Sequence, residues 1–448
     1  MNRHERRRQA KLDQRQLGVA TDPVQLVARG MAHHQGGEID AAEELYQSAL
    51  RLNPKLAEPW NFLGAIALGR GDPAKAAERY ARALELRPDW PEALNGAAHA
   101  LHAIERFDES IVHFRRAVEL DPAFGPAWNG LGIAVQRGRD FEESLACFRR
   151  ACECDPKSSA FAFNLGVNLK HQQRWSEARA AFEHTLALRP HYPEAMAQMA
   201  HCWRKEGRDA EAAEWYRRYL EIASDDIAGA GLFLAARAGG ALAATPSPAY
   251  VRQLFDDYAA GFDAHLQGEL HYDVPEQFER VLASWMDARN RKLAILDLGC
   301  GTGLVAERFR ARASRLVGVD LSPRMLEKAR ERRVYTELVL DGVVEYLERT
   351  RASFELVLAG DVFNYLGDLA PVLRASRARL QAGGRLAFSV EATEEGVHLD
   401  RSLRFAHGEA YVRGVLAEAG FEIVSFERCV LRVESGVPAP GFLVVASA

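Results

Sequence analysis

The residues with the clearest capacity for chemistry lie in the stretch LDLGCGTGL, residues 296–304. An apolar run ends in Asp297, and glycines follow at positions 299, 301 and 303. Glycine permits a tight turn and the close approach of a ligand, so a strand-to-helix turn of this composition is typical of sites for nucleotide-like ligands. The stretch therefore predicts such a site, and neighbouring residues must decide which ligand it takes.

An acidic residue lies at the end of each of the first four predicted strands. These residues are Asp297, Asp320, Asp341 and Asp361. In an open α/β sheet, ligands bind at the carboxyl ends of the strands, so these carboxylates should surround one ligand. Two ligand classes use glycine turns of this kind, dinucleotides and S-adenosylmethionine.

A dinucleotide fits these residues poorly. Its fingerprint requires a glycine at position 304, where this chain has Leu304. A pyrophosphate at the helix start would also be repelled by Asp297. S-adenosylmethionine has an ammonium, a sulfonium and a ribose diol but no phosphate, and these groups suit carboxylates. The acids therefore favour S-adenosylmethionine.

The elements that must position these residues are seven short apolar runs in the second half of the chain. They are LAILDLG, RLVGVDL, TELVLDG, FELVLAGD, GRLAFSVE, FEIVSFE and GFLVVAS. The first five alternate with helical segments such as 322–333, in which Ser322 is a predicted cap and Pro323 the first helical residue. This pattern predicts a seven-stranded, mostly parallel sheet with helices on both faces and an antiparallel last strand.

The motifs DLGCGTG and GVDLSPRML resemble the first two motifs of the class I S-adenosylmethionine-dependent methyltransferases, a Rossmann-like fold. The resemblance implies that the turn cradles the methionine end of the cofactor, through Asp297, Gly299, Cys300, Gly301 and Gly303. It implies that Asp320 binds both ribose hydroxyls. It places the adenine against Leu321, Met325, Asp341 and the backbone of Gly342. Asp361 would border the point of methyl transfer.

The methyl acceptor is less evident from the residues. An Asn/Asp-Pro-Pro-Tyr/Phe loop, typical of amino-group methylation on adenine or glutamine, is absent, and Asp361 is followed by Val-Phe-Asn-Tyr instead. No Pro-Cys pair for cytosine attack and no metal-ligand cluster are found. Methyl transfer to a hydroxyl needs alignment and a base. His407 is the candidate base, with Tyr411 one helical turn on; alternatively, His407 caps or packs against the following helix.

A lid is expected before the sheet. The helical segment YVRQLFDDYAAGFDAHL contains Tyr258, Phe262 and His265, which either cover the cofactor or form ordinary amphipathic core. This segment, together with AGDVFNYLGDL and HGEAYVRGVLAEAGF, resembles a bacterial family that joins tetratricopeptide repeats to a methyltransferase domain. The resemblance covers nearly the whole chain and implies no particular substrate.

The first half of the chain repeats itself every 34 residues. The repeat is marked by Pro54, Pro88, Pro122, Pro156 and Pro190, with an aromatic residue eight positions before each proline and a small residue four positions before that. Antiparallel helix pairs need such small and bulky partners where they cross. The pattern resembles the tetratricopeptide repeat and predicts an α-solenoid of about six repeats over residues 23–226.

Repeats of this kind bind partners, and the first helices line the groove. Asn61, Asn95 and Asn129 recur at one repeat position and could grip an extended peptide main chain, with His99 and His102 facing the same groove. Alternatively, asparagine is merely tolerated there. Three functions therefore stay open: a methyltransferase with a protein or peptide substrate, a small-molecule methyltransferase docked by its repeats, and a non-catalytic cofactor-binding scaffold.

The composition also indicates the domain boundaries, the classes of partner and the cellular compartment. Residues 1–22 form a basic tail expected to be disordered, 227–248 a linker, and 249–448 the methyltransferase domain. The net charge of −5 makes nucleic acid an unexpected partner, and no apolar run is long enough for a membrane span. Six unpaired cysteines suggest a reducing cytoplasm.

Overall fold

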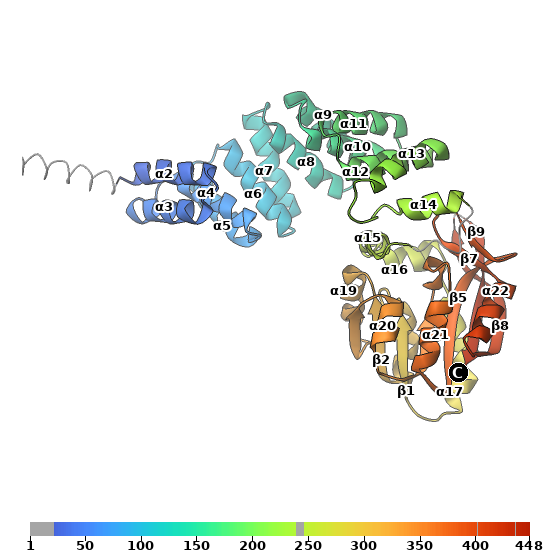
Figure 1. Cartoon of the computed structure of the whole chain (residues 1–448). Coiled ribbons are helices and arrows are strands. Elements are labelled where there is room, and N and C mark those ends of the chain that lie inside the picture. Colours follow the sequence, from blue (N-terminus) through green and yellow to red (C-terminus); the bar gives the residue numbers. More distant parts are fainter. Residues whose placement is uncertain (1–21, 239–245, 401, 435) are drawn as a thin grey trace, which may run out of the picture. The chain divides into compact units, whose positions relative to one another are not determined.

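A computed structural model of the 448-residue chain describes residues 22–238, 246–400, 402–434 and 436–448 (Figure 1). The chain forms two compact units, Met1–Ala212 and Ala213–Ala448. Apart from Asp22, the predicted basic tail lies outside the described residues, as does the 239–245 part of the predicted linker. Among the described residues, no helix combines the length and apolar character needed to cross a membrane.

Twelve helices form the six predicted repeats, two helices to a repeat. They are α2 (Pro23–Gln35), α3 (Ile39–Leu52), α4 (Ala57–Gly69), α5 (Pro73–Leu86), α6 (Pro91–Ala103), α7 (Phe107–Leu120), α8 (Gly125–Arg137), α9 (Phe141–Cys154), α10 (Ser159–His171), α11 (Trp175–Leu188), α12 (Pro193–Lys205) and α13 (Asp209–Leu220). The second helices α3, α5, α7, α9 and α11 each end two residues before a periodic proline, as the missing N–H of proline requires. The predicted solenoid is confirmed.

The small and bulky positions of each repeat fit together at the helix crossing. A Cβ atom at Gly30 would lie 2.6 Å from the buried ring of Tyr46, and one at Gly166 would lie 2.6 Å from the ring of Phe182. Where the small residue is Ser110, its buried hydroxyl donates to the carbonyl of Ala98 at 2.8 Å. The 34-residue pattern therefore reports steric fit between the two helices of a repeat.

The segment after the repeats is more ordered than the predicted linker. Helix α14 (Ala230–Arg237) begins where Asp226 accepts hydrogen bonds from two backbone N–H groups, and buried Phe233 packs on Tyr216 with ring centroids 5.0 Å apart. The predicted linker therefore contains a helix at 230–237, and its residue Phe233 has an aromatic partner that the linker composition did not indicate. The division between the two units also falls at 212/213, earlier than residue 226.

The second unit is built on a branched sheet (Figure 1). Its strands are β1 (Leu293–Leu298), β2 (Ala313–Asp320), β3 (Glu337–Leu340), β4 (Phe354–Ala359), β5 (Leu380–Thr393), β6 (Val397–Leu399), β7 (Phe405–Gly408), β8 (Glu422–Glu434) and β9 (Val437–Ser447). Their order is β3-β2-β1-β4-β5-β7-β6, and β9 pairs with both β5 and β8. Strands β1 to β5 and β7 run parallel, whereas β6, β8 and β9 are antiparallel to their neighbours.

The sheet has nine strands rather than the predicted seven. All seven predicted strands are present, and the last is antiparallel as expected. The two additional strands, β6 and β7, have three and four residues and pair with each other, and β7 also pairs with the carboxyl end of β5. Strands this short carry no readable apolar pattern, which is why the sequence did not reveal them.

Helices cover both faces of the sheet. The helices from residue 246 onward are α15 (Pro248–Tyr258), α16 (Phe262–Ala264), the π-helix η2 (His265–Glu269), α17 (Val274–Asp287), α18 (Leu304–Phe309), α19 (Pro323–Arg332), α20 (Val343–Arg349), α21 (Ala370–Arg379) and α22 (Glu409–Glu418). Residues of α20, α21 and α22 share one hydrophobic core with the sheet, and residues of α17 and α18 share the other. This layering leaves the carboxyl ends of β1, β2 and β4 to form the site.

Candidate methyl-transfer site

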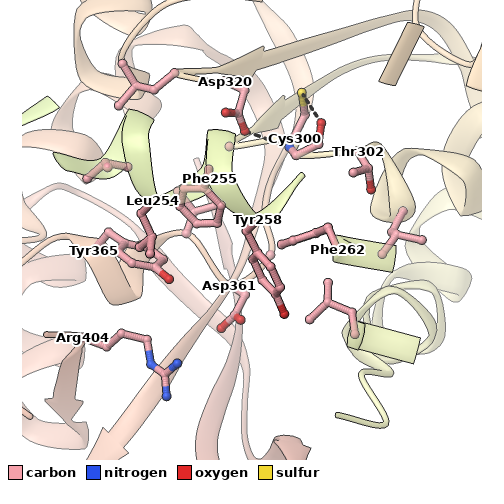
Figure 2. A pocket seen from close by; sticks show the side chains of 18 of the residues that line it. Leu254, Phe255, Tyr258, Phe262, Cys300, Thr302, Asp320, Asp361, Tyr365 and Arg404 are labelled. Atoms are coloured by element: carbon pink, nitrogen blue, oxygen red, sulfur yellow. Dashed lines mark hydrogen bonds between the residues drawn. The ribbon is translucent and has the colours of Figure 1, made fainter. Parts of the chain in front are cut away.

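A cavity of about 1000 Å³ opens at the carboxyl ends of the parallel strands (Figure 2). Its walls are the segment 246–272, the glycine turn after β1, the end of β2, residues 342–345, residues 360–366, and parts of 402–404 and 432–436. This volume is at the upper end of ligand pockets and is large enough for a cofactor with a second, smaller ligand beside it.

The glycine turn forms one wall of the cavity. Gly299 and Gly301 have φ angles of 59° and 52°, in the left-handed region that favours glycine. A side chain at Gly299 would strike Val362, whereas Gly301 has only the ring of Phe262 within 4 Å of where its Cβ would lie. Cys300 also lines the cavity, and burial raises the pKa of its thiol well above the ordinary value. The turn therefore presents backbone, and no thiolate, to a ligand.

Asp320 at the end of β2 is the best-placed carboxylate. Its side chain is almost wholly buried, lines the cavity, and accepts 2.8 Å hydrogen bonds from the backbone N–H groups of Gly301 and Ser322. Burial raises its pKa, and the backbone N–H donors oppose that shift. Each carboxylate oxygen retains a lone pair, so Asp320 can accept hydrogen bonds from both hydroxyls of a diol.

Two residues of the predicted cradle lie behind the turn. Asp297 is buried, does not line the cavity, and accepts a 2.7 Å hydrogen bond from the Tyr335 hydroxyl. Burial raises the pKa of Asp297 to about 7, partly offset by that hydrogen bond. A Cβ at Gly303 would lie 3.0 Å from the Tyr335 ring. Both residues support the turn from its inner side.

The predicted adenine contacts divide in the same way. Leu321 and Gly342 line the cavity, but Met325 and Asp341 do not. Met325 is fully buried in α19, because the cap formed by Ser322 turns the helix so that this side chain enters the core. Asp341 accepts from the N–H of Gly342 at 3.0 Å and forms an ion pair with Arg349.

Asp361 anchors a charged cluster at the other end of the cavity. It has a φ of 58°, accepts from Asn364, and forms two hydrogen bonds of 2.9 and 3.1 Å with Arg432. Although burial opposes its charge, Asp361 and Glu391 hold the pKa of Arg432 above its ordinary value.

Two further side chains complete this charged cluster. Glu434 accepts from Arg432 at 2.6 Å, and Arg404 lies 2.9 Å from Glu391. Two guanidinium groups therefore face the three carboxylates of Asp361, Glu391 and Glu434. Glu391 does not line the cavity, so the members of this cluster that face a ligand are Asp361, Glu434 and the two guanidinium groups.

His407 and Tyr411, the expected catalytic pair, lie outside the cavity. His407 is in β7, fully buried, and its Nε2 donates to the carbonyls of Leu366 and Gly367 at 2.9 and 3.2 Å. Burial lowers the pKa of His407 to about 4. Tyr411 stacks on this ring, and its hydroxyl accepts from the N–H of Leu369. The expectation for this pair is corrected: the two side chains hold the 366–369 loop against β7.

The three residues of the expected lid line the cavity. Figure 2 shows Tyr258 and Phe262 projecting into it from α15 and α16. The Tyr258 hydroxyl is hydrogen-bonded to Nδ1 of His265. Asp263 bonds to Thr302 and to Arg332, so the segment is tied to the glycine turn and to α19.

Several cavity residues were missed by sequence reasoning. They are Tyr250, Phe255, Tyr272, Thr302, Tyr365, Arg404, Arg432 and Glu434. Tyr365 falls within the motif AGDVFNYLGDL and could have been found there. Arg404 and Arg432 belong to no recognised motif and meet only because β7 and β8 bring them to the same end of the sheet.

The predicted partner residues lie on the first helices of the second to fourth repeats. Asn61, Asn95 and Asn129 are half-buried. The Oδ1 atoms of Asn61 and Asn95 are buried without a partner, whereas Oδ1 of Asn129 accepts from Asn164 at 2.8 Å. Unsatisfied buried carbonyl groups are costly, and a donor from a ligand could satisfy them if the side chains turned outward.

His99 and His102 are less available than expected. The His99 ring packs edge-on against Phe114 with centroids 5.0 Å apart, and His102 does the same against Phe107 at 5.1 Å. Burial lowers the pKa of both imidazoles, so neither offers a cation. Both rings are half-buried parts of the helix packing within the third repeat.

Comparison with known proteins agrees with the two kinds of architecture. Residues 296–388 match the family described as methyltransferase domain. Tetratricopeptide-repeat families match residues 26–56, 63–123, 95–159, 129–190 and 169–236. The fold and site define a class I methyltransferase domain. The chain therefore joins tetratricopeptide repeats to a methyltransferase domain.

Individual relatives are distant. A malonyl-[acyl-carrier protein] O-methyltransferase of Serratia marcescens is 29% identical over 166 residues, which is 37% of this chain and 62% of that protein. A ubiquinone biosynthesis O-methyltransferase of Methylocella silvestris is 36% identical over 95 residues, 20% of this chain and 37% of that protein. The chain thus spans less than two thirds of these relatives. A solved structure described as the functional characterization of Pseudomonas aeruginosa pilF covers 47% of this chain and 96% of its own, with 15% identity and a TM-score of 0.43.

The cofactor of such domains is S-adenosylmethionine, and the cavity residues fit it. A buried carboxylate with unused lone pairs, Asp320, lies beside backbone exposed at Gly301. Asp361 and Glu434 line the same cavity. Asp320 would hold the ribose diol, and residues 299–302 would border the methionine end. No phosphate-binding cation lies at the glycine turn among the described lining residues.

Proposed function

We propose that this chain is an S-adenosylmethionine-dependent O-methyltransferase whose repeat unit recruits a protein or peptide substrate or partner. The observation that carries the proposal is the buried carboxylate of Asp320, which is hydrogen-bonded to the glycine turn and whose remaining lone pairs suit a ribose diol. Oxygen as the accepting atom is supported by the distant relatives, which are named O-methyltransferases.

When bound, the cofactor supplies an electrophilic methyl group. The chain's own contribution is alignment and the exclusion of water. Phe255, Phe262 and Tyr365 contact one another or Tyr258 at ring centroid distances of 4.9 to 6.3 Å and form an apolar wall. An acceptor entering between this wall and Asp361 would have its oxygen directed toward the methionine end of the cofactor.

The repeat unit supplies a second recognition surface. The carboxamides of Asn61, Asn95 and Asn129 lie one repeat apart and could bond to successive peptide groups of an extended chain. Because this grip uses main-chain groups, it would tolerate many sequences. The class of the partner is therefore a protein segment without regular structure.

The experiment combines the purified full chain, S-adenosylmethionine labelled in the methyl group, and lysate of the source cells. We expect label in macromolecules, and its release by mild base would identify a methyl ester. A triple variant, Asn61→Ala with Asn95→Ala and Asn129→Ala, should lose this labelling while keeping cofactor affinity. Gln47→Ala removes an exposed carboxamide from α3 and serves as the matched control.

A small-molecule acceptor is the second candidate, favoured by a cavity of about 1000 Å³ that is large enough for a second, smaller ligand beside the cofactor. Label in the soluble small-molecule pool, undiminished in the triple variant, would establish it. If S-adenosylmethionine binds but label enters neither pool, both methyltransferase functions are contradicted. The remaining function is then a non-catalytic scaffold that binds the cofactor.

A further inference from the structure

We propose that Tyr258 and His265 form a proton path that receives the proton of a hydroxyl acceptor, and that Glu269 orients the imidazole. The inference rests on the proposed O-methyltransferase function and narrows its substrate class to alcohols or phenols. It replaces His407 with groups that line the cavity.

The three side chains form a continuous line along the cavity wall. The Tyr258 hydroxyl is hydrogen-bonded to Nδ1 of His265, and Nε2 of His265 lies 3.6 Å from Oε2 of Glu269. All three residues line the cavity. An imidazole held by a carboxylate on one nitrogen can accept a proton on the other, which is the arrangement required of a base.

The backbone that carries His265 and Glu269 is unusual. Residues His265–Glu269 form a π-helix, in which the N–H of Leu270 donates to the carbonyl of His265 at 3.0 Å. Such turns are rare and occur frequently at functional sites. The wider turn comes directly after α16, so it determines the direction in which His265 meets Tyr258.

The Tyr258 hydroxyl lies at the methyl-transfer end of the cavity. Figure 2 shows it directed toward Asp361, and its surroundings include charged groups from three other elements: Asp361 after β4, Arg404 before β7 and Arg432 in β8. Burial and the nearby Glu269 raise the pKa of Tyr258. Tyr258 therefore stays a neutral phenol. When its oxygen receives a proton from the acceptor, it must release its own proton to His265 at the same time.

Two carboxylates of the cavity wall, Asp361 and Glu434, are already engaged. Asp361 is bonded to Arg432 and Asn364, and Glu434 is bonded to Arg432 and Arg404. A carboxylate neutralised in this way is a weak base. Among the described lining residues, the Tyr258–His265 pair stands apart from these guanidinium contacts.

The step balances in atoms and charge. The acceptor oxygen forms a bond to the methyl carbon as the carbon–sulfur bond breaks, and the sulfonium becomes a neutral thioether. The acceptor proton passes to the Tyr258 oxygen while the Tyr258 proton passes to Nδ1 of His265. The resulting imidazolium lies beside Glu269, which is exposed and can return the proton to water.

The test uses the full chain with labelled cofactor and the lysate fraction that accepts label. His265→Gln and Tyr258→Phe should each lower transfer on the order of 100-fold, the usual contribution of a general base. His265→Ala should regain transfer when imidazole is added, which a merely structural role would not produce. His398→Gln, an exposed histidine in β6, is the matched control and should behave as wild type.

A second readout needs no acceptor. In a nitrogen nuclear magnetic resonance spectrum of the His265 ring, Tyr258→Phe should move the Nδ1 resonance, because the hydroxyl bonded to Nδ1 is lost. An unchanged Nδ1 resonance overturns the path even if the chain transfers no methyl group. If wild type transfers label but His265→Gln matches it at every pH, the proposed function stands and the path fails.

Discussion

The repeat unit and the methyltransferase domain use buried polar side chains in opposite ways. In the described repeat helices the buried polar residues are uncharged, namely Ser110, Ser144, Asn168 and Thr185. All four donate to helix carbonyls or to one another at 2.8 to 2.9 Å. In the methyltransferase domain the buried polar residues include Asp297, Asp320, Glu355, His407 and Arg432.

The difference follows from what each unit does. A solenoid gains stability by stacking equivalent helix pairs, so its interior needs only steric fit and satisfied hydrogen bonds. A catalytic cavity needs charge placed where solvent does not screen it. Removing one buried polar group should therefore be mild in the repeats and severe around the cavity.

The largest effect is expected for Arg432→Met. This change leaves Asp361, Glu391 and Glu434 close together with only Arg404 to neutralise them. Breaking such a buried pair typically costs about 3–5 kcal/mol. Urea unfolding should report the loss, with hydrogen exchange in β5 and β8 locating it. Arg413→Met, which removes a surface pair with Glu409, should change stability little.

Asp320→Asn should weaken cofactor binding without unfolding the domain. An amide in place of the carboxylate loses one charge-assisted contact to the ribose diol, which corresponds to about 1.5–3 kcal/mol, or at least tenfold in affinity. Calorimetry with S-adenosylmethionine measures this, and Asp287→Asn on α17 is the control. Unchanged affinity would remove Asp320 from the site, and binding of NAD would contradict the ligand assignment.

Asp297 predicts a pH dependence of stability. Burial raises the pKa of Asp297 in the folded state to about 7, whereas its pKa in the unfolded chain is about 4. The folded state then binds the proton more tightly, so this contribution is complete below about pH 4 and is lost as the pH rises through about 7. Stability should fall by about 2 kcal/mol between about pH 5 and pH 8, and Asp297→Asn should flatten that profile. An equal slope in both proteins would contradict this.

The smallest effect is expected for Ser110→Ala. This variant restores the alanine found at the same repeat position in Ala42 and Ala76, and removes one hydrogen bond to a carbonyl that is already in a helix. The free energy of unfolding should change by less than about 1 kcal/mol. A loss as large as that of Arg432→Met would erase the distinction between the two units.

Much of the fold could be predicted because its signals are local in the chain. The prolines after each second helix and the glycines at 299, 301 and 303 can be recognised from the residues beside them, and the 34-residue period from positions within one helix pair, such as Gly30 and Tyr46. The same holds for seven of the nine strands. The short strands β6 and β7 were not predicted because β7 depends on pairing with β5, and β6 on pairing with β7, rather than on an apolar pattern of their own.

The site was predicted only in part. The sequence by itself predicted that the glycine turn, Asp320 and Asp361 lie at the cavity, because each directly follows an apolar run that can be recognised as a strand. Only the tertiary structure decided that His407 and Met325 are buried away from the cavity, and that Arg432 meets Asp361 across 71 residues. Whether a side chain faces a cavity or a core depends on helices and strands brought together from distant parts of the chain, and their packing leaves no pattern in the residues beside it.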